Sequence, residues 1–330
     1  MPTWKNASGP LPYPVTNDYL FRVLLQKSEA VLRSLICSVF EISETDITSI
    51  HITNPIILGE AIDEKDYILD VNVLLNNKIS VNFEMQVINY GDWPERSLQY
   101  LCRNFDFLNK GEDYINSRTA IHIGILDFQL FEETEPEFFS SYKLMNTKSH
   151  RVYSDKLQLF TLALPFIDHA TETDKQFHRD MWGYFFKAET WEDLKIMENN
   201  YPIIGEAASI VYNAVNDKAI RDRIEARADY ERRQRTLQRQ ITSQKEIIAS
   251  QKEEINSQKE EIASQKEKLA SQKEELASQK EKLASQKEEL ASQKEELASQ
   301  EGEISVLQEQ ISDRDKIIAE LKNQIKILQS

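Results

Sequence analysis

The hydrophobic and polar positions divide the chain into two parts with different periods. From Ile241 to Ile325, isoleucine or leucine recurs at every seventh position, thirteen times in succession. This heptad spacing places an apolar stripe along a helix and is typical of a coiled coil. A single helix cannot bury its own stripe, so we expect the segment 241–330 to assemble the protein into a homo-oligomer.

The last heptads indicate how many strands the coiled coil has. Leu307, Leu321 and Leu328 each follow an isoleucine by three residues, which gives isoleucine at heptad position a and leucine at d. This combination favours a parallel dimer. Position d is glutamine from Gln244 to Gln300, so the middle of the repeat leaves strand number and orientation open.

Before residue 205, segments whose hydrophobic residues recur with a helical period alternate with segments that have the pattern of strands. Asn17 precedes an amphipathic helix that we predict to run to about Phe40, and Pro94 lies in the first turn of a second one. Short β-branched or alternating runs predict strands. The predicted strands cover 48–57, 67–75, 79–87, 119–127 and 156–164, and the helices cover 18–40, 94–108, 174–187, 190–199 and one continuous stretch from Glu206. This order predicts an α/β sandwich, followed by a long C-terminal coiled-coil helix.

Composition agrees with a globular head and an extended tail. Prolines and aromatic residues are well represented before residue 205, and no proline follows it. We therefore predict a globular domain over 1–205, a helical connector with a basic cluster over 206–240, and the coiled coil over 241–330.

The chain shows the pattern of neither a signal peptide nor a membrane span. The N-terminal residues lack a positively charged region followed by an apolar one, and no apolar run approaches 18 residues. Cys37 and Cys102 both fall in apolar helical patterns, so we expect buried free thiols. These features predict a cytoplasmic protein that does not bind membranes.

Charge is distributed unevenly between the two parts. The chain has a net charge of −15. Residues 221–330 contain 21 basic and 23 acidic side chains, a net charge of −2, and residues 1–220 contain 19 basic and 32 acidic ones, a net charge of −13. An acidic head is a poor surface for tight nonspecific DNA binding, which requires basic groups. The one basic run could contact DNA, but interleaved acids also fit a solvated helix; it comprises Arg221, Arg223, Arg227, Arg232, Arg233, Arg235 and Arg239.

The candidate chemistry lies in the hairpin between the second and third predicted strands. A three-residue loop over Asn76–Lys78 pairs Leu75 with Ile79, and asparagine tolerates the left-handed position that such loops require. In this register Asp70 lies opposite Glu84 on one face of the sheet. We prefer it to the register of a two-residue turn because the apolar faces of the two strands also agree in it.

Opposed carboxylates repel each other, and a divalent cation offsets that repulsion. Asp70 and Glu84 are therefore candidate ligands for Mg²⁺, which could activate water and stabilise charge on a phosphate. Gln86 points to the same face and could orient the water or contact a phosphate oxygen. The same alternation also fits a simply hydrated face of an antiparallel sheet, so both interpretations remain open.

A set of short motifs over about residues 15–200 carries a family resemblance. The motifs are Asn17–Arg22, Leu69–Val71, Phe83–Gln86, Arg96 with Tyr100, Ile125–Phe128 and Leu162–Phe166. Together they resemble the recombination-promoting nuclease (Rpn) family, whose members are also described as transposases, of the PD-(D/E)XK nuclease superfamily.

The resemblance implies a restriction-endonuclease-like fold, in which a mixed sheet is flanked by helices. It also implies a DNA endonuclease that depends on Mg²⁺, with Mn²⁺ as a substitute. It implies that Asp70 and Glu84 are metal ligands and that Gln86 is a catalytic residue in the place of the motif's lysine. A neutral glutamine cannot add positive charge beside the scissile phosphate. The alternative is therefore a catalytically inactive protein that keeps the nuclease fold for a structural or DNA-tethering role.

Three other residues are accessory candidates. Asp18 could supply a third acidic group, although an acid in the first turn of a helix is common. Arg96 and Tyr100 lie four residues apart on one helix face and could either contact a phosphate or pack against the sheet. The five histidines show no metal-ligand spacing, which argues against zinc.

Overall fold

The computed structural model describes residues 3–56, 58, 70–105, 111, 113–131 and 135–328. The chain divides into two compact units, residues 1–242 and residues 243–330. Helix α8 (Lys218–Leu328) contributes its first turns to the first unit and all the described residues of the second.

A mixed β-sheet forms the centre of the first unit. Within the described residues it has six strands in the order β1-β2-β3-β4-β6-β5. The strands β3, β4 and β6 run parallel, and the other neighbouring pairs are antiparallel. Their bounds are β1 Ile50–Ile52, β2 Val71–Leu75, β3 Ile79–Gln86, β4 Thr119–Leu126, β5 Phe139–Lys143 and β6 Leu157–Ala163. The predicted α/β class with a mixed sheet is confirmed.

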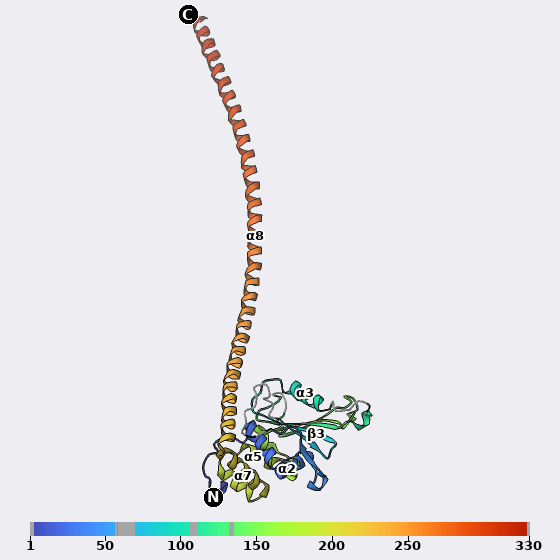
Figure 1. Ribbon diagram of the computed structural model, residues 1–330. Coiled ribbons are helices and arrows are strands. Elements are labelled where there is room, and N and C mark those ends of the chain that lie inside the picture. The colour runs from blue at the N-terminus through green and yellow to red at the C-terminus, as the bar shows by residue number, and fades with distance from the viewer. Residues whose placement is uncertain are drawn as a thin grey trace. The chain divides into compact units, whose positions relative to one another are not determined.

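Helices cover both faces of this sheet (Figure 1). Helix α3 (Trp93–Phe105) packs on one face, against β3, β4 and β6, and the larger group of helices lies on the other. That group contains α1 (Asp18–Lys27), α2 (Glu29–Phe40), α5 (Arg179–Lys187) and α7 (Pro202–Asn216), with the shorter α4 (Glu172–Gln176) and α6 (Trp191–Glu198). Short 3-10 helices occupy Trp4–Asn6, Glu44–Asp46, Tyr114–Asn116 and Leu164–His169. Burial of the apolar faces between helices and sheet is the main stabilising contribution.

Three predicted helices are interrupted, and each break has a local cause. The helix predicted over 18–40 ends and restarts at Ser28, whose hydroxyl accepts the Val31 amide at 3.0 Å and so caps α2. The left-handed backbone of His178 separates α4 from α5. The helix predicted from Glu206 onward is broken at Asp217, whose carboxylate accepts the Ile220 amide at 3.1 Å.

Other differences from the sequence-based expectations concern extent and burial. The first unit extends past residue 205 because Ala207, Ala208 and Val211 of α7 are fully buried in its core. Strand β5 was not predicted. Cys102 is exposed and Cys37 only partly buried, so the expectation of two buried thiols is wrong. The predicted positions 57, 67–69 and 106–108 lie outside the described residues.

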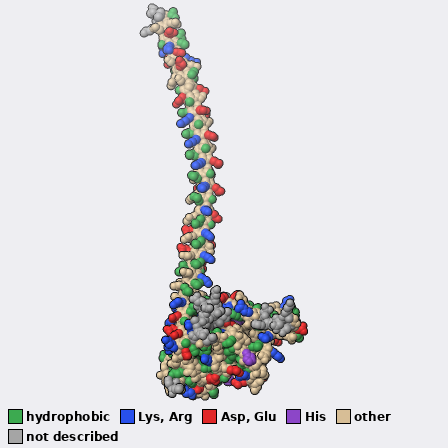
Figure 2. All heavy atoms as spheres, in the orientation of Figure 1, with side chains coloured by type: hydrophobic (Ala, Val, Ile, Leu, Met, Phe, Trp, Pro, Cys, Tyr) green, Lys and Arg blue, Asp and Glu red, His purple; other side chains and the backbone are tan. Residues whose placement is uncertain are grey.

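The second unit consists of α8 beyond Thr242. Residues 243–325 are all exposed, including every isoleucine and leucine of the heptad series. Figure 2 shows these apolar side chains recurring along the helix among lysines and glutamates. The prediction of a helix through this segment is confirmed from Lys218 to Leu328, and the exposed stripe is the surface that a coiled coil would bury. No helix in the described part of the chain is long and apolar enough to cross a membrane.

Candidate active site

The hairpin of β2 and β3 has the register expected from its three-residue loop. Leu75 pairs with Ile79 and Asn72 with Asn82, and the left-handed φ angles of Asn76 and Asn77 close the loop. Asp70 directly precedes β2, so the same register places it opposite Glu84. The prediction of the register is confirmed.

The polar face of this hairpin is buried. Asp70, Asn82 and Glu84 are 4%, 0% and 5% exposed, because α3 packs over β3 and β4. The alternative of a simply hydrated sheet face is therefore wrong at these positions. Burying carboxylates is costly unless they are paired, hydrogen-bonded or metal-bound, so the contacts of each oxygen are informative.

The carboxylate of Asp70 is held through one of its two oxygens. Its Oδ2 accepts hydrogen bonds from the side-chain amides of Asn82 and, at 3.3 Å, Asn72. The guanidinium of Arg22 and the Asn54 amide donate to the Asp70 carbonyl and fix its backbone. Asp70 Oδ1 is buried and has no hydrogen-bond partner among the described residues.

Glu84 is arranged in the same way. Its Oε1 lies 2.6 Å from Nη2 of Arg96, which α3 brings over the sheet. Its Oε2 is buried without a hydrogen-bond partner in the described structure, and His122 Nε2 is 3.8 Å away. Each of the two carboxylates thus has one oxygen bound by the protein and one oxygen left over.

Burial shifts the protonation equilibria of this cluster. Desolvation raises the pKa of Glu84 from its ordinary value to about 7; the ion pair with Arg96 opposes the rise, and the Asp70 charge adds to it. Desolvation also raises the pKa of Asp70, although the hydrogen bond from Asn82 opposes this. The pKa of His122 falls to about 3 because of its burial and the nearby Arg96 charge, so this imidazole is neutral at physiological pH.

His122 belongs to the support of the site. It lies on β4 opposite Asn82 and is fully buried. Its ring stacks on Tyr100, with the ring centroids 5.8 Å apart and nearly parallel planes, and it also contacts Trp93 at 5.5 Å. The stack joins α3 to the sheet and thereby positions Arg96, one turn before Tyr100.

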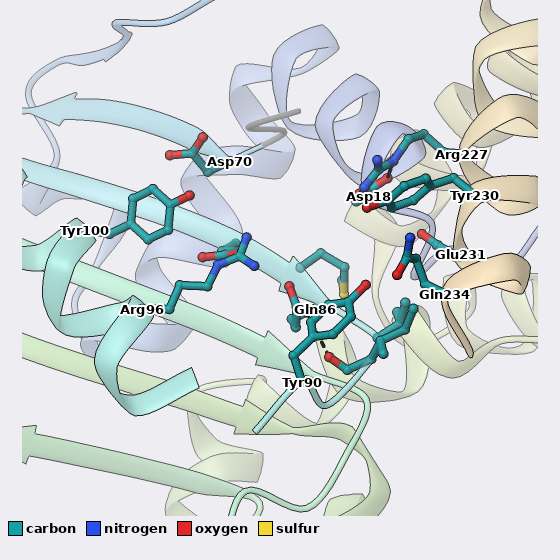
Figure 3. A pocket seen from close by; sticks show the side chains of 14 residues that line it. Asp18, Asp70, Gln86, Tyr90, Arg96, Tyr100, Arg227, Tyr230, Glu231 and Gln234 are labelled. Atoms are coloured by element: carbon teal, nitrogen blue, oxygen red, sulfur yellow. Dashed lines mark hydrogen bonds and ion pairs between the residues drawn. The ribbon is translucent and has the colours of Figure 1, made fainter. Parts of the chain in front are cut away.

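A pocket of about 230 Å³ opens over this cluster. Figure 3 shows Asp70, Arg96 and Tyr100 on one side of it and Asp18, Arg227, Tyr230 and Glu231 on the other. Gln86 also lines the pocket, and its Nε2 donates to the Ile88 carbonyl at 2.9 Å. The α8 residues of this wall all precede Thr242 and belong to the first unit.

Asp18 is paired with Arg227 of α8 on the opposite side of the pocket from Asp70 (Figure 3). Both of its carboxylate oxygens contact the guanidinium of Arg227, with Nε 2.9 Å from Oδ1. Arg227 also lies over the Tyr230 ring, 4.7 Å from its centroid. Glu231 is 7% exposed, and desolvation raises its pKa to about 7. Asp18 thus shares the pocket with Asp70 and Glu84, but it is paired with α8.

The structure thus brings all six candidate residues into one pocket: Asp18, Asp70, Glu84, Gln86, Arg96 and Tyr100. Sequence reasoning missed the supporting Asn82 and His122 and the α8 residue Glu231. A single histidine inside the apolar run 119–126 is a signal that could have identified His122. No comparable signal distinguishes Glu231 from the other acids of α8.

The donor set agrees with a divalent cation. The described residues contain no group of three or more His, Cys, Asp or Glu side chains arranged to hold a metal ion. They do offer Asp70 Oδ1 and Glu84 Oε2, two buried carboxylate oxygens that accept no hydrogen bond from the described part of the chain. Mg²⁺ is commonly bound by one or two carboxylates and completes its shell with water and phosphate oxygens, so these two residues suit it.

A comparison with protein-family models gives one relationship. The model described as PD-(D/E)XK nuclease family transposase matches residues 15–241. No curated protein and no solved structure matches the chain. The matched range contains the whole pocket and ends where the first compact unit ends.

Proposed function

The chain belongs to the PD-(D/E)XK nuclease family transposases, and we propose on this premise that it is a DNA endonuclease that hydrolyses phosphodiester bonds with Mg²⁺ as its cofactor. Mn²⁺ is expected to substitute for Mg²⁺. Family membership supports a nuclease or transposase type of activity, and the buried carboxylates support the dependence on a metal.

One observation carries the proposal. Asp70 and Glu84 each present a buried oxygen without a hydrogen-bond partner in the described structure, while Asn82 and Arg96 fix the other oxygen of each carboxylate. Leaving such groups unpaired costs free energy. Asp70 and Glu84 are the residues that would hold a divalent cation, which would offset this cost.

Each residue of the site has a separate proposed role in phosphodiester hydrolysis. Asp70 and Glu84 would hold the cation, which, when bound, activates water and stabilises the charge that develops on the scissile phosphate. Gln86 lies on the same face of β3 as Glu84 and lines the pocket. Its amide is suited to orienting the attacking water or a phosphate oxygen. Tyr100 is proposed as an accessory residue that supports the site through its stack on His122.

The exposed stripe of α8 supports a homo-oligomer, which we propose to be a parallel dimer through residues 241–330. The stripe holds isoleucine or leucine in every heptad. A long exposed apolar stripe of this kind marks a surface that another protein chain covers. A dimer would present two active sites, as cutting both strands of a duplex requires. The cytoplasmic location remains a prediction from the sequence.

Plasmid cleavage tests the proposed activity. Purified protein incubated with supercoiled plasmid and Mg²⁺ should convert it to nicked and linear forms, and EDTA should stop the conversion. An Asp70→Asn variant, which retains the size and hydrogen-bonding capacity of the side chain, should be inactive. Cleavage that persists in EDTA would contradict the proposal.

The alternative is a catalytically inactive protein with a structural or DNA-tethering role. Two observations favour it: Gln86 brings no positive charge, and residues 1–220 are strongly acidic. Calorimetry with Mn²⁺ discriminates between the two functions, because an inactive relative has no reason to keep an ion site. A wild-type protein that binds no Mn²⁺ and cuts no DNA would favour the alternative.

A further inference from the structure

The pocket contains more negative than positive side chains. Four carboxylates line it, from Asp18, Asp70, Glu84 and Glu231, and its cationic lining residues among those described are Arg96 and Arg227. A scissile phosphate adds further negative charge. Since Gln86 is neutral, Arg96 and Arg227 are the described lining side chains that could add positive charge beside the proposed cation to offset the charge of the phosphate.

The two arginines differ in how firmly they are held. Arg227 contacts both oxygens of Asp18 and lies over Tyr230. Arg96 contacts one oxygen of Glu84 and also hydrogen-bonds with the side chain of Tyr100, whose ring centroid is 5.8 Å from the guanidinium. The Arg96 side chain is 34% exposed, whereas that of Glu84 is 6% exposed. Arg96 therefore contacts the buried carboxylate while remaining partly accessible in the pocket that both residues line.

A cation bound to Glu84 changes what Arg96 can do. The metal and the guanidinium compete for the same negative charge, so binding of the metal weakens the hold of Glu84 on Arg96. The guanidinium keeps its charge and its forked donors, which suit phosphate oxygens. Helix α3 is fixed to the sheet by Trp93 and Tyr100, so Arg96 stays beside the site after it leaves Glu84.

We propose that Arg96 is a catalytic residue that contacts the scissile phosphate and supplies the positive charge that Gln86 lacks. In the absence of metal it neutralises Glu84, and the metal releases it to the DNA. This inference rests on the proposed nuclease function and assigns a role to one further residue of the same site.

The test compares Arg96→Gln with a matched control, Arg151→Gln, which removes the same charge from an exposed position outside the pocket. Binding to a short duplex is measured in Ca²⁺ over a range of salt concentrations. Loss of one phosphate contact should reduce the slope of log K against log[salt] by about 0.9. The control should keep the wild-type slope.

Two further measurements separate a phosphate contact from a purely structural role. If Arg96 only orients Glu84, Arg96→Gln should weaken Mn²⁺ binding in calorimetry. Our inference predicts Mn²⁺ affinity equal to or above that of the wild type, because a competitor for Glu84 is gone. Cleavage should fall on the order of 10²–10³-fold, and adding Gln86→Lys to Arg96→Gln should restore part of it.

The inference is overturned if Arg96→Gln keeps the wild-type salt slope or loses Mn²⁺ affinity. If that variant does not fold, Arg96→Lys, which retains the charge, serves instead. It should keep the wild-type salt slope, and a reduced slope would overturn the inference. Failure of the proposed function looks different, because the wild-type protein itself would then neither bind Mn²⁺ nor cut plasmid.

Discussion

The indole of Trp93 fills the space beside Gly124 in which any other residue would carry its Cβ. An ideal Cβ at Gly124 would lie 2.2 Å from Trp93 Cζ2. Gly124 pairs with Glu84 in the parallel ladder of β3 and β4, and Trp93 begins the helix that carries Arg96. The absent side chain therefore sets how closely α3 approaches the carboxylate of Glu84.

Replacing Gly124 with alanine should displace α3 from the sheet. We expect a loss of about 1–3 kcal/mol in the free energy of unfolding, as is usual for overpacked cores, together with weaker cleavage because α3 carries Arg96 away from the pocket. Urea denaturation checks the stability. Gly302→Ala is the control, since an added Cβ there meets no atom within 4 Å. A Gly124→Ala protein as stable as the wild type would show that α3 can adjust without cost.

The raised pKa of Glu84 predicts that metal affinity depends on pH. A carboxylate must lose its proton to bind a cation, and the pKa of Glu84 is about 7. The apparent Mn²⁺ affinity should therefore rise by up to roughly tenfold per pH unit below 7 and level off above it. Calorimetry at pH 6 and pH 8 measures this. Glu231→Gln is the control, because Glu231 has a pKa of about 7 in the same pocket. If that variant lost the pH dependence, Glu231 would be the group responsible.

The raised pKa of Glu84 also predicts that its contribution to the stability of the metal-free protein falls as pH rises, whereas the metal affinity rises. Between about pH 4.5 and pH 7 the folded protein keeps the Glu84 proton that the unfolded chain has released, so the contribution of Glu84 to stability falls as pH rises through this window. Glu84→Gln should lack this component. Thermal unfolding of both proteins at pH 5 and pH 8 should show that the variant gains relative stability at the higher pH. A constant difference between them would mean that the pKa of Glu84 is not raised.

The terminal heptads should contribute most to assembly. Deleting residues 304–330 should dissociate the oligomer more readily than deleting residues 262–289, which removes whole heptads and preserves the phase of the repeat. Burying one leucine contributes about 1.5–3 kcal/mol, whereas a glutamine amide does little more than offset its own desolvation. The terminal a and d positions, interrupted by Arg314, are Ile304, Leu307, Ile311, Ile318, Leu321, Ile325 and Leu328.

Sedimentation of both deletion variants at equal concentration measures this difference. Equal dissociation constants would show that the assembly energy is spread along the repeat. A wild-type chain that sediments as a monomer would contradict the coiled coil itself.

The sequence was sufficient to predict the hairpin that carries the site. The Asn76–Lys78 loop and the two apolar faces allow one consistent register, and a shift by one residue would turn Glu84 to the other face. Local pattern therefore determined the relation of Asp70 to Glu84. The seven-residue period of α8 could also be predicted from local pattern, because isoleucine or leucine recurs at thirteen successive positions.

Features that depend on packing between distant segments could not be predicted in this way. The burial of Asn82 and the contact of Arg96 with Glu84 both arise from the close approach of α3, which Gly124 permits. The break at Asp217 lets α7 enter the core and lets α8 carry Arg227 to Asp18. The hydrophobic pattern of the sequence marks neither Gly124 nor the break at Asp217, because each depends on a contact between segments that are far apart in the chain.

Cleavage of supercoiled plasmid by the wild-type protein and by Glu84→Gln, side by side in Mg²⁺ at pH 8, tests the metal site and the nuclease function most directly. The amide retains the shape of the side chain and an oxygen that can accept from Arg96, and it removes one of two repelling charges, so the variant should remain folded by circular dichroism. We predict that the wild type cuts the plasmid and that Glu84→Gln does not. Cleavage by the variant at the wild-type rate would show that Glu84 is not a metal ligand.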